Sequence, residues 1–497
     1  MRGGKAIPVV KQAWQLGLPF GTAEVGGGQP SPSDAGAGTD RSVPGPRAVP
    51  KPSGKEKRSM SATMEMVSEG LKEAFEKVAS NKGAAGPDGR SVDEVRAHLP
   101  ALLPLLASSL LDGSYRPGDI RRVWIPKAGG GQRGLGIPDV VDRMVQEAVR
   151  RVLEPLYEPT FHPNSHGFRP GRSCHTAIQQ ARSFIEEGYE WVVDLDLERF
   201  FDQVSHQRLM SRLAERVSDK RLLVLIGRML KAKVVMPDGV VVSTEEGVPQ
   251  GGPLSPLLSN IVLDELDWEL ERRGHRFVRY ADDSNVYVAT ERAGQRVMAS
   301  LTSFIERRLR LKVNAGKSAV ARPEERHFLG FRLRCEPLEG EVEVLLSKRS
   351  KERIDSKIVE LTPRTWGSSL ARCISKVNTY LLGWSGFFRI CTASEERTFS
   401  WLDAHIRRRL RAILLKQWKR KRTIVRKLIG LGVNPKAGWR GVYAGHKSLW
   451  ALSPCPAVDR GLRNAYFAER GLVSLRERWK EHHQAIVPPV QLTLALG

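Results

Sequence analysis

FVRYADDSNVYV, the stretch at residues 277–288, decides the fold of this chain. Two runs rich in β-branched and aromatic residues flank the turn formers Ala281 to Ser284, a pattern that predicts a β-hairpin. Aspartate is common in turns, so a purely structural hairpin is one interpretation. However, the adjacent carboxylates of Asp282 and Asp283 repel each other unless cations neutralise them. The hairpin is therefore a candidate metal site.

A second strand offers a further carboxylate. Residues 191–197 (WVVDLDL) alternate as a strand, which places Val192, Asp194 and Asp196 on one face. An edge strand with a solvated face would explain these acids without any chemistry. Carboxylate oxygens also suit Mg²⁺, and two such ions about 3.5–4 Å apart support nucleotidyl transfer. We expect Asp196 and Asp282 to be the main catalytic metal ligands and Asp283 to support them, with two Mg²⁺ as cofactor and Mn²⁺ as a substitute.

Composition points to a nucleic-acid partner. The 497 residues are 41% hydrophobic, enough for about two to four domains with cores. The formal net charge of +24 indicates a polyanionic partner, although a ribosome-associated protein or a merely soluble surface would share it. The five cysteines form no C-x-x-C pair, which argues against a zinc module and fits a reducing compartment. No stretch reaches the roughly 18 apolar residues of a membrane span, so we expect no membrane partner and a cytoplasmic location.

Four segments follow one another along the chain. Residues 1–58 are rich in Gly, Pro, Ser and Ala and are interpreted as a disordered leader. Residues 59–340 mix strand and helix patterns, 341–450 are basic and mainly helical, and 451–497 form a short tail. Periodicity predicts strands over 121–126 and 328–333 and helices over 139–157 and 399–418.

The basic segment favours nucleic-acid contact. From His405 to Arg440 there are thirteen Lys or Arg and no acid, and such a cluster repels itself without a polyanion. Tryptophans interleave with these cations and could stack on bases, although we expect core packing for Trp384 and Trp401. The apolar face of the helix over 399–418 is predicted to leave its arginines (Arg407, Arg408, Arg409 and Arg411) largely pointing away from it.

Residues 280–283 (YADD) resemble the catalytic motif of reverse transcriptases, in the form common among group II intron proteins. Further segments match that family in the same order. The resemblance implies an α+β right-hand polymerase, with fingers and palm over 59–340, an α-helical thumb or maturase (X) domain over 341–450, and a short DNA-binding segment within 451–497. The matching segments are 81–89 and 165–173 in the fingers, 196–202 at the first carboxylate, 247–256 in the template-positioning loop and 328–331 at the closing palm strand.

The resemblance also implies roles for single residues. Lys127 and Arg133 would grip the incoming triphosphate, Phe201 would exclude a ribose 2′-hydroxyl, Gln250 would brace the nascent base pair, and Lys317 would protonate the leaving pyrophosphate. Each residue could instead have a purely structural role. Lys127, Arg133 and Lys317 could be ordinary surface cations, Phe201 could pack in the core, and Gln250 could cap backbone groups of a turn. The expected nucleic-acid contacts are Arg169, Arg172, Arg407, Arg408, Arg411, Lys419, Arg420, Lys421 and Arg422.

Functionally, the resemblance implies an RNA-directed DNA polymerase of a group II intron. It would bind intron RNA to assist splicing, support retromobility on a DNA target and primer strand, consume dNTPs, and associate with the nucleoid when bound to DNA. Its likeness to class C introns, whose proteins lack an endonuclease, implies priming from an existing nick or nascent strand. Two alternatives stay open: an RNA-binding maturase without polymerase activity, and a reverse transcriptase repurposed for host defence or repair.

Two residues depart from the family pattern. They are His166, where relatives usually carry Tyr, and Arg199, where Gly is frequent.

Overall fold

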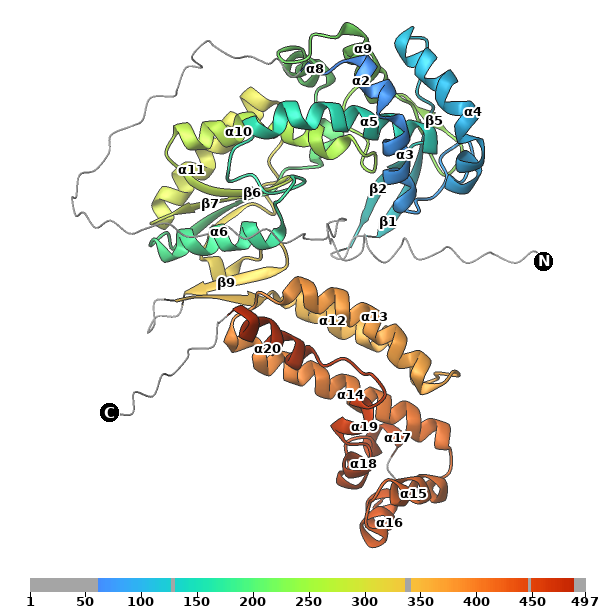
Figure 1. Cartoon of the computed structure of the whole chain (residues 1–497). Coiled ribbons are helices and arrows are strands. Elements are labelled where there is room, and N and C mark those ends of the chain that lie inside the picture. Colours follow the sequence, from blue (N-terminus) through green and yellow to red (C-terminus); the bar gives the residue numbers. More distant parts are fainter. Residues whose placement is uncertain (1–60, 127–129, 336–340, 446–447, 487–497) are drawn as a thin grey trace, which may run out of the picture.

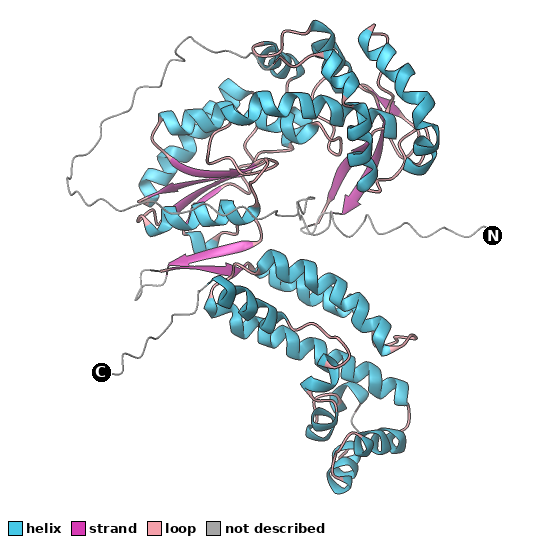
Figure 2. Ribbon diagram, viewed as in Figure 1, coloured by secondary structure: helices cyan, strands magenta, loops and turns pink. Residues whose placement is uncertain are grey.

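The computed structural model describes residues 61–126, 130–335, 341–445 and 448–486, so the expected leader at 1–58 lies outside the described residues. In Figure 1 a lobe of mixed helices and strands, coloured blue to yellow, lies above a helical lobe in orange and red. Figure 2 shows that the strands are confined to the upper lobe and to the junction between the two. This is the α+β organisation that the sequence predicts.

The fingers combine a helical layer with a small sheet. Helix α5 (Val140–Tyr157) begins one residue later than the helix predicted over 139–157, and three N-terminal helices pack against it. The first residues of α4 are held by a capping box in which Ser91 and Glu94 exchange hydrogen bonds. The sheet has the strand order β2-β1-β4-β5. These elements are α2 (Met64–Glu69), α3 (Leu71–Ser80), α4 (Val92–Leu111), β1 (Ile120–Pro126), β2 (Gln132–Ile137), α5 (Val140–Tyr157), η1 (Glu158–Thr160), α8 (His206–Ala214), α9 (Lys220–Leu230), β4 (Val234–Val235) and β5 (Val241–Val242).

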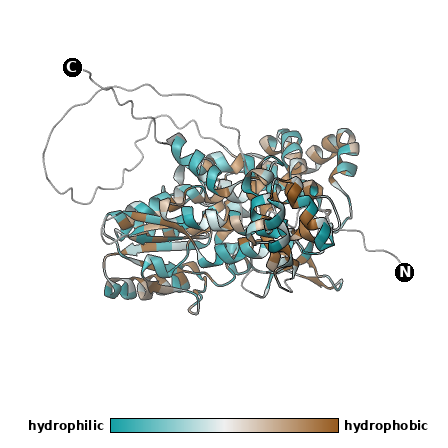
Figure 3. Ribbon diagram, turned by 90° about the horizontal axis from the view of Figure 1, so that it is seen from below, coloured by the Kyte–Doolittle hydropathy of each residue, from teal (hydrophilic) through white to brown (hydrophobic). Residues whose placement is uncertain are grey.

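The palm is an antiparallel sheet with the order β6-β7-β3-β8. Adjacent residues of β3 enter different cores: Val193 packs with the fingers helices and α10, whereas Val192 packs with α6 and the thumb. Neighbouring residues of a strand point to opposite faces, so a strand covered on both faces carries apolar residues at consecutive positions. Figure 3 shows apolar (brown) and polar (teal) residues in both the strands and the helices around them. The elements are α6 (Cys174–Glu186), β3 (Trp191–Leu195), α7 (Phe200–Gln203), α10 (Ser255–Arg272), β6 (Arg276–Tyr280), β7 (Asp283–Val288), α11 (Glu291–Phe304), η2 (Ile305–Leu309), β8 (Ala319–Ala321) and η3 (Pro323–Glu325).

A hairpin joins the palm to the thumb. Strand β9 (Phe331–Cys335) pairs antiparallel with β10 (Val342–Leu346), so a domain boundary at 340/341 would separate two paired strands. The strand predicted over 328–333 starts only at Phe331, because Phe328 and Phe331 exchange backbone hydrogen bonds of 3.0 and 2.9 Å and close a tight turn. Leu329 and Gly330 in that turn have positive φ angles of 53° and 89°.

The thumb is entirely helical within its described residues. Helices α12, α13, α14 and α20 pack against one another, and smaller helices extend the far end of α14. Among the described residues, no helix is long and apolar enough to cross a bilayer. The thumb elements are α12 (Lys348–Leu361), α13 (Leu370–Phe388), η4 (Ala393–Glu395), α14 (Glu396–Trp418), α15 (Lys421–Gly430), α16 (Pro435–Tyr443), α17 (Leu449–Leu452), α18 (Pro456–Gly461), α19 (Asn464–Ala468) and α20 (Leu475–Ile486).

Two of the arginines expected to point away from the core are in fact buried. Arg409 is 6% exposed and donates to Thr362 through Nε (2.5 Å to Oγ1) and Nη2 (2.7 Å to the carbonyl). Arg411 is 7% exposed, donates from Nε to the Leu462 carbonyl at 3.0 Å, and forms a salt bridge with Asp459. Helix α14 packs against other helices on more than one side, so the two-faced pattern predicted for it is wrong at these positions.

Candidate active site and nucleic-acid interface

Strand pairing brings the three predicted catalytic carboxylates to one end of the palm sheet. In the antiparallel pair of β3 and β7, Asp194 lies opposite Asn285 and Leu195 opposite Ser284. Continuing this register by one residue places Asp196 opposite Asp283. Asp282 precedes Asp283 in the turn between β6 and β7. The hairpin predicted over 277–288 is therefore confirmed, and its turn lies beside the end of β3.

The charges at this sheet end perturb one another. Desolvation by surrounding groups, followed by the negative charges of Asp282, Asp194 and Asp196, raises the pKa of Asp283 to about 7, even though this residue is exposed at the protein surface. Burial also raises the pKa of Asp282, against the opposing effect of the nearby Arg133 guanidinium. Carboxylates whose negative charges raise each other's pKa values in this way are candidates for cation binding.

The donor set fits divalent magnesium. Among the described residues, no three His, Cys, Asp or Glu side chains converge closely enough to hold a metal ion by themselves. Mg²⁺ usually retains several waters and is held by one or two carboxylates together with substrate phosphates. Hard oxygen donors that repel one another are suited to such an ion, and Asp196, Asp282 and Asp283 supply them.

Asp194, on β3, and Asp196, one residue beyond its end, have different partners. Asp194 Oδ2 accepts hydrogen bonds from Arg326 Nε at 2.9 Å and Nη2 at 2.6 Å, so its charge is already compensated. Asp196 Oδ1 instead lies 3.6 Å from Nζ of Lys317, whose side chain is 64% exposed. The geometry thus favours Asp196 over Asp194 as the ligand and places Lys317 beside it.

Three further nucleotide-contact candidates lie in the described part of the chain, whereas Lys127 lies outside it. Arg133 is on β2, close enough for its charge to act on Asp282 and Asp283. Phe201 is half-buried on α7, and its carbonyl accepts from the Val248 amide at 2.6 Å. The ring of its neighbour Phe200 is buried, as expected for core packing.

Gln250 belongs to a loop that is closely joined to the fingers. Its carbonyl accepts a hydrogen bond from the Gly136 amide on β2 at 2.7 Å. The next residue, Gly251, has a φ of +127°, and a Cβ there would lie 2.4 Å from the Gly136 carbonyl oxygen. Glycine is therefore required where this loop meets the fingers strand. The loop and the strand carrying Arg133 are held together as one wall of the site.

The structure corrects the expectation for Arg169. Its side chain is 6% exposed and forms a salt bridge with Glu158. Nη1 donates to the carbonyls of His162 at 2.6 Å and Ser165 at 2.9 Å. This guanidinium holds its own loop together and does not face a nucleic acid. Arg172 is half-buried and donates to the Pro163 carbonyl at 2.8 Å, leaving its remaining nitrogens available.

The predicted thumb cations divide into two groups. Arg411 is engaged in the core, Arg407 is half-buried, and the Arg408 guanidinium lies 4.3 Å from the ring centroid of Trp450. The cations at the start of α15 are more accessible: Lys419, Arg420 and Arg422 are exposed and Lys421 is half-exposed. No salt bridge involves these four residues within the described part of the thumb.

Aromatic side chains accompany this second group. Trp439 and Tyr443 of α16 are 46% and 43% exposed, and their rings stack at 5.1 Å with an interplanar angle of 27°. Lys421 Nζ lies 5.3 Å from the Tyr443 ring centroid. Sequence reasoning missed Tyr443, although its spacing of four residues from Trp439 on a helix was a usable signal.

The two tryptophans predicted to pack in the core behave differently. Trp384 is buried, which confirms the prediction. Trp401 is 56% exposed and stacks on His405 at 5.5 Å, so the prediction is wrong for this residue.

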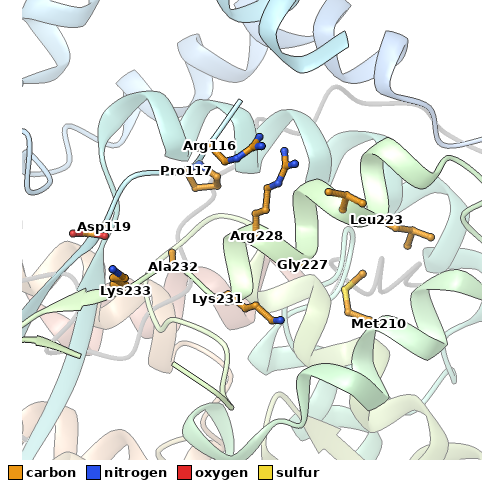
Figure 4. A pocket seen from close by; sticks show the side chains of 11 residues that line it. Arg116, Pro117, Asp119, Met210, Leu223, Gly227, Arg228, Lys231, Ala232 and Lys233 are labelled. Carbon is orange, nitrogen blue, oxygen red and sulfur yellow. The ribbon is translucent and has the colours of Figure 1, made fainter. Parts of the chain in front are cut away.

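A groove on the fingers lies apart from these residues (Figure 4). Its volume is about 670 Å³, and apolar side chains such as Met210 and Leu223 line it together with Arg116, Lys231 and Lys233. None of the predicted site residues contributes to its wall. This groove is therefore not part of the candidate active site at the end of the palm sheet.

Carboxylates at the end of a palm sheet, between α/β fingers and a helical thumb, define a template-directed nucleic-acid polymerase. Comparison with known families agrees. Residues 125–333 match the family described as "Reverse transcriptase (RNA-dependent DNA polymerase)", and residues 351–429 match "Group II intron, maturase-specific domain".

Individual relatives point the same way. Protein YkfC of Escherichia coli (strain K12) is 34% identical over 353 residues, which cover 62% of this chain and 89% of YkfC. The group II intron-encoded protein LtrA of Lactococcus lactis subsp. cremoris is 38% identical over 39% of this chain and 32% of LtrA. The putative COX1/OXI3 intron 2 protein of Saccharomyces cerevisiae is 33% identical over 47% of this chain and 26% of that protein. The chain thus spans about a third or less of the last two relatives.

Among solved structures, the "Partial Cas6-RT-Cas1--Cas2 complex" is similar, with a TM-score of 0.33 and 23% identity over 49% of this chain and 42% of that one. The sequence relatives and the matched domains determine the assignment. The chain belongs to the family of group II intron reverse transcriptases and maturases, and it is an RNA-directed DNA polymerase. Its reverse transcriptase domain implies dependence on a divalent metal, and its maturase domain implies intron RNA as a partner.

Proposed function

We propose that this chain polymerises DNA on an RNA template by two-metal nucleotidyl transfer at Asp196, Asp282 and Asp283, using Mg²⁺ or, as a substitute, Mn²⁺. It also binds group II intron RNA to assist splicing and supports retromobility at a DNA target. The observation that supports the polymerase most directly is the β3–β7 pairing, which ends with Leu195 opposite Ser284. If this register is continued by one residue, Asp196 lies opposite Asp283. The raised pKa of Asp283, caused by desolvation and then by the charges of neighbouring acids, supports a site at which a cation would be favourable.

Each residue of the site has a distinct task in this mechanism. The carboxylates would hold the two ions, which when bound activate the primer 3′-hydroxyl and stabilise the leaving pyrophosphate. Arg133 neutralises the triphosphate of the incoming nucleotide. Phe201 stands against the 2′ position of its sugar and excludes a hydroxyl there. Lys317, beside Asp196, donates a proton to the departing pyrophosphate oxygen.

The thumb provides the proposed intron RNA surface. Lys419, Arg420, Lys421 and Arg422 have phosphates as natural partners because no acid lies among them in sequence. The stacked rings of Trp439 and Tyr443 offer a platform for unpaired bases beside these cations. Such binding stabilises the folded intron and requires no protein active site in the thumb.

Primer extension tests the polymerase. The protein is given an RNA template, an annealed DNA primer, dNTPs and Mg²⁺, next to the isosteric variant Asp282→Asn/Asp283→Asn. Asp238→Asn serves as the matched control. Asp238 lies in an exposed turn, and its carboxylate accepts a hydrogen bond from the Val240 amide. We expect extension by the wild type and the control and none by the double variant. If the wild type does not extend while it binds intron RNA in a salt-dependent manner, the chain is a maturase without polymerase activity.

A further inference from the structure

A buried ion pair lies directly behind the catalytic turn. Arg279, on β6, is three residues before Asp282, and its side chain and that of Asp267 on α10 are both 0% exposed. Nε lies 2.7 Å from Oδ1 and Nη2 2.5 Å from Oδ2, so the pair is bidentate. Buried pairs of this kind contribute little net stability because desolvation offsets their attraction. In some proteins such a pair fixes one conformation of the groups around it.

Arg279 uses every hydrogen-bond donor of its guanidinium. Besides the two bonds to Asp267, Nη2 donates to Ser165 Oγ at 2.7 Å. Nη1 donates to Asn260 Oδ1 at 3.0 Å and to the carbonyl of Ala281 at 2.9 Å. Five donors with five acceptors leave no alternative orientation of similar energy for the side chain.

The bond to Ala281 holds a strained residue. Ala281 has a φ of +58°, the left-handed region, which costs a non-glycine residue roughly 1–2 kcal/mol. This conformation turns the chain between Tyr280 and Asp282. The acceptor on Ala281 is thus fixed by a side chain that is itself anchored to α10.

The same cluster fixes the turn from its other side. Asn260 Nδ2 donates to the Gly167 carbonyl at 2.8 Å. A Cβ on Gly167 would lie only 2.2 Å from the Ala281 nitrogen, so the loop carrying Gly167 presses directly on the turn. The backbone amide of Arg279 also donates to the Asn164 carbonyl at 2.9 Å. The turn therefore rests on α10 and on this loop together.

We infer that Arg279 is a positioning residue for the polymerase, which acts with Asp267 and Asn260 to fix the Ala281 turn so that Asp282 and Asp283 face the metal and the substrate. It touches neither metal nor substrate itself. The inference rests on the proposed two-metal site and adds the element that orients it. Misplacement of catalytic groups by about 1 Å can cost on the order of 100-fold in rate, so loss of the network affects the rate more than binding of the template.

Arg279→Lys tests this directly. Lysine keeps the charge but lacks the planar fork, so it cannot serve Asp267, Ser165 and Ala281 together. We expect the maximal rate of primer extension to fall about tenfold or more. The Mg²⁺ concentration for half-maximal rate should rise about threefold, and affinity for template–primer should stay within about twofold. Arg409→Lys is the matched control, because Arg409 is another buried arginine with partners at Thr362 and no contact with the site. It should lower the melting temperature without changing either kinetic quantity.

Asn260→Ala covers the case in which Arg279→Lys does not fold. It keeps the ion pair and removes one bond to Arg279 and one to Gly167, so a smaller change in the same two quantities is expected. The fold of each variant is checked by circular dichroism. If every variant that folds keeps the wild-type rate and Mg²⁺ dependence, the inference is overturned. Failure of the proposed function has a different signature, since the wild type itself would then not extend a primer.

Discussion

Arg326 and Asp194 form a two-point salt bridge in which two guanidinium nitrogens, Nε and Nη2, donate to the same carboxylate oxygen at 2.9 and 2.6 Å. Asp194 and Asp196 alternate onto one face of their strand, so the sequence pattern alone does not distinguish them. The difference between them comes from a residue more than 130 positions away. Asp194 is bound by an arginine, whereas Asp196 Oδ1 lies 3.6 Å from Nζ of the exposed Lys317.

We predict opposite consequences for the two strand acids. Asp194→Asn leaves Arg326 without its counter-charge in a half-buried setting, and the free energy of unfolding should fall by about 1–3 kcal/mol. Primer extension should persist at temperatures where the variant is folded. Asp196→Asn should abolish extension while leaving unfolding nearly unchanged, because it removes a carboxylate that the neighbouring acids repel. Urea denaturation and primer extension on both variants check this. An inactive Asp194→Asn together with an active Asp196→Asn would reverse the assignment.

Lys317 is expected to act on the leaving group. Removal of a general acid typically costs 10²–10⁴-fold in rate, so Lys317→Ala should slow single-nucleotide incorporation by about 100-fold. Lys317→Arg should restore little, because a guanidinium does not give up its proton. Lys312, an exposed lysine five residues earlier, is the control, and Lys312→Ala should remain within about twofold of wild type. Rapid-quench measurements settle the matter, and equal rates for the two alanine variants would remove Lys317 from the mechanism.

Of two adjacent phenylalanines, we expect Phe200 to contribute mainly to the stability of the fold and Phe201 to the selection of deoxyribonucleotides over ribonucleotides. Phe200 is buried, so Phe200→Ala should cost about 3–5 kcal/mol of unfolding free energy. Half-buried Phe201 should lose less stability in the Phe201→Ala variant, whereas discrimination of dCTP against CTP, measured as the ratio of kcat/KM, should fall about tenfold or more. Unchanged discrimination would mean that Phe201 only packs in the core.

His166 should make stability depend on pH. Burial, followed by the charges of Arg172, Arg169 and Arg279, lowers its pKa to about 4 from an ordinary value of 6.5. The fold therefore holds a neutral imidazole, whereas the unfolded chain takes up a proton as the pH falls below about 6.5. Stability is lost from there down to about pH 4, by about 3 kcal/mol in total. His166→Asn can retain the contact with Thr176 that His166 Nδ1 makes at 2.9 Å, and it cannot titrate. Its unfolding free energy should fall less steeply between pH 6.5 and 4 than that of the wild type, and parallel curves would contradict the assignment.

Local patterns sufficed for the parts of the fold that depend on near neighbours in sequence. The hairpin over 277–288 and the helix ending at Tyr157 follow from alternation and helical spacing, and the structure has both. Burial that depends on distant partners could not be foreseen. Core packing is the expectation for Trp401, yet nothing in the sequence shows which side of α14 the other helices cover.

The same limit applies to charged residues. Arg169 lies in a Gly-, Pro- and Arg-rich loop that has the composition of a surface, and its acceptors are mostly backbone carbonyls that no side-chain pattern reveals. The bond from Arg279 to Asp267 likewise joins a strand to a helix whose packing had to be known first. Charge in a sequence predicts the class of partner, whereas the paired or free state of each cation is set by the fold.

The sequence predicts nucleic-acid contact for two groups of thumb cations alike. Because only one group is exposed, we expect the two groups to contribute differently to RNA binding. Arg420, Lys421 and Arg422 are at least partly exposed, so replacing all three by Gln should reduce the slope of log affinity against log salt by about 2–3. Arg411→Gln removes a buried guanidinium from Leu462 and Asp459, and it should lower the melting temperature while leaving the salt slope within about 0.5 of wild type. Filter binding of intron RNA at a series of salt concentrations measures both slopes. A slope that changed only in Arg411→Gln would place the RNA on α14 rather than at the start of α15.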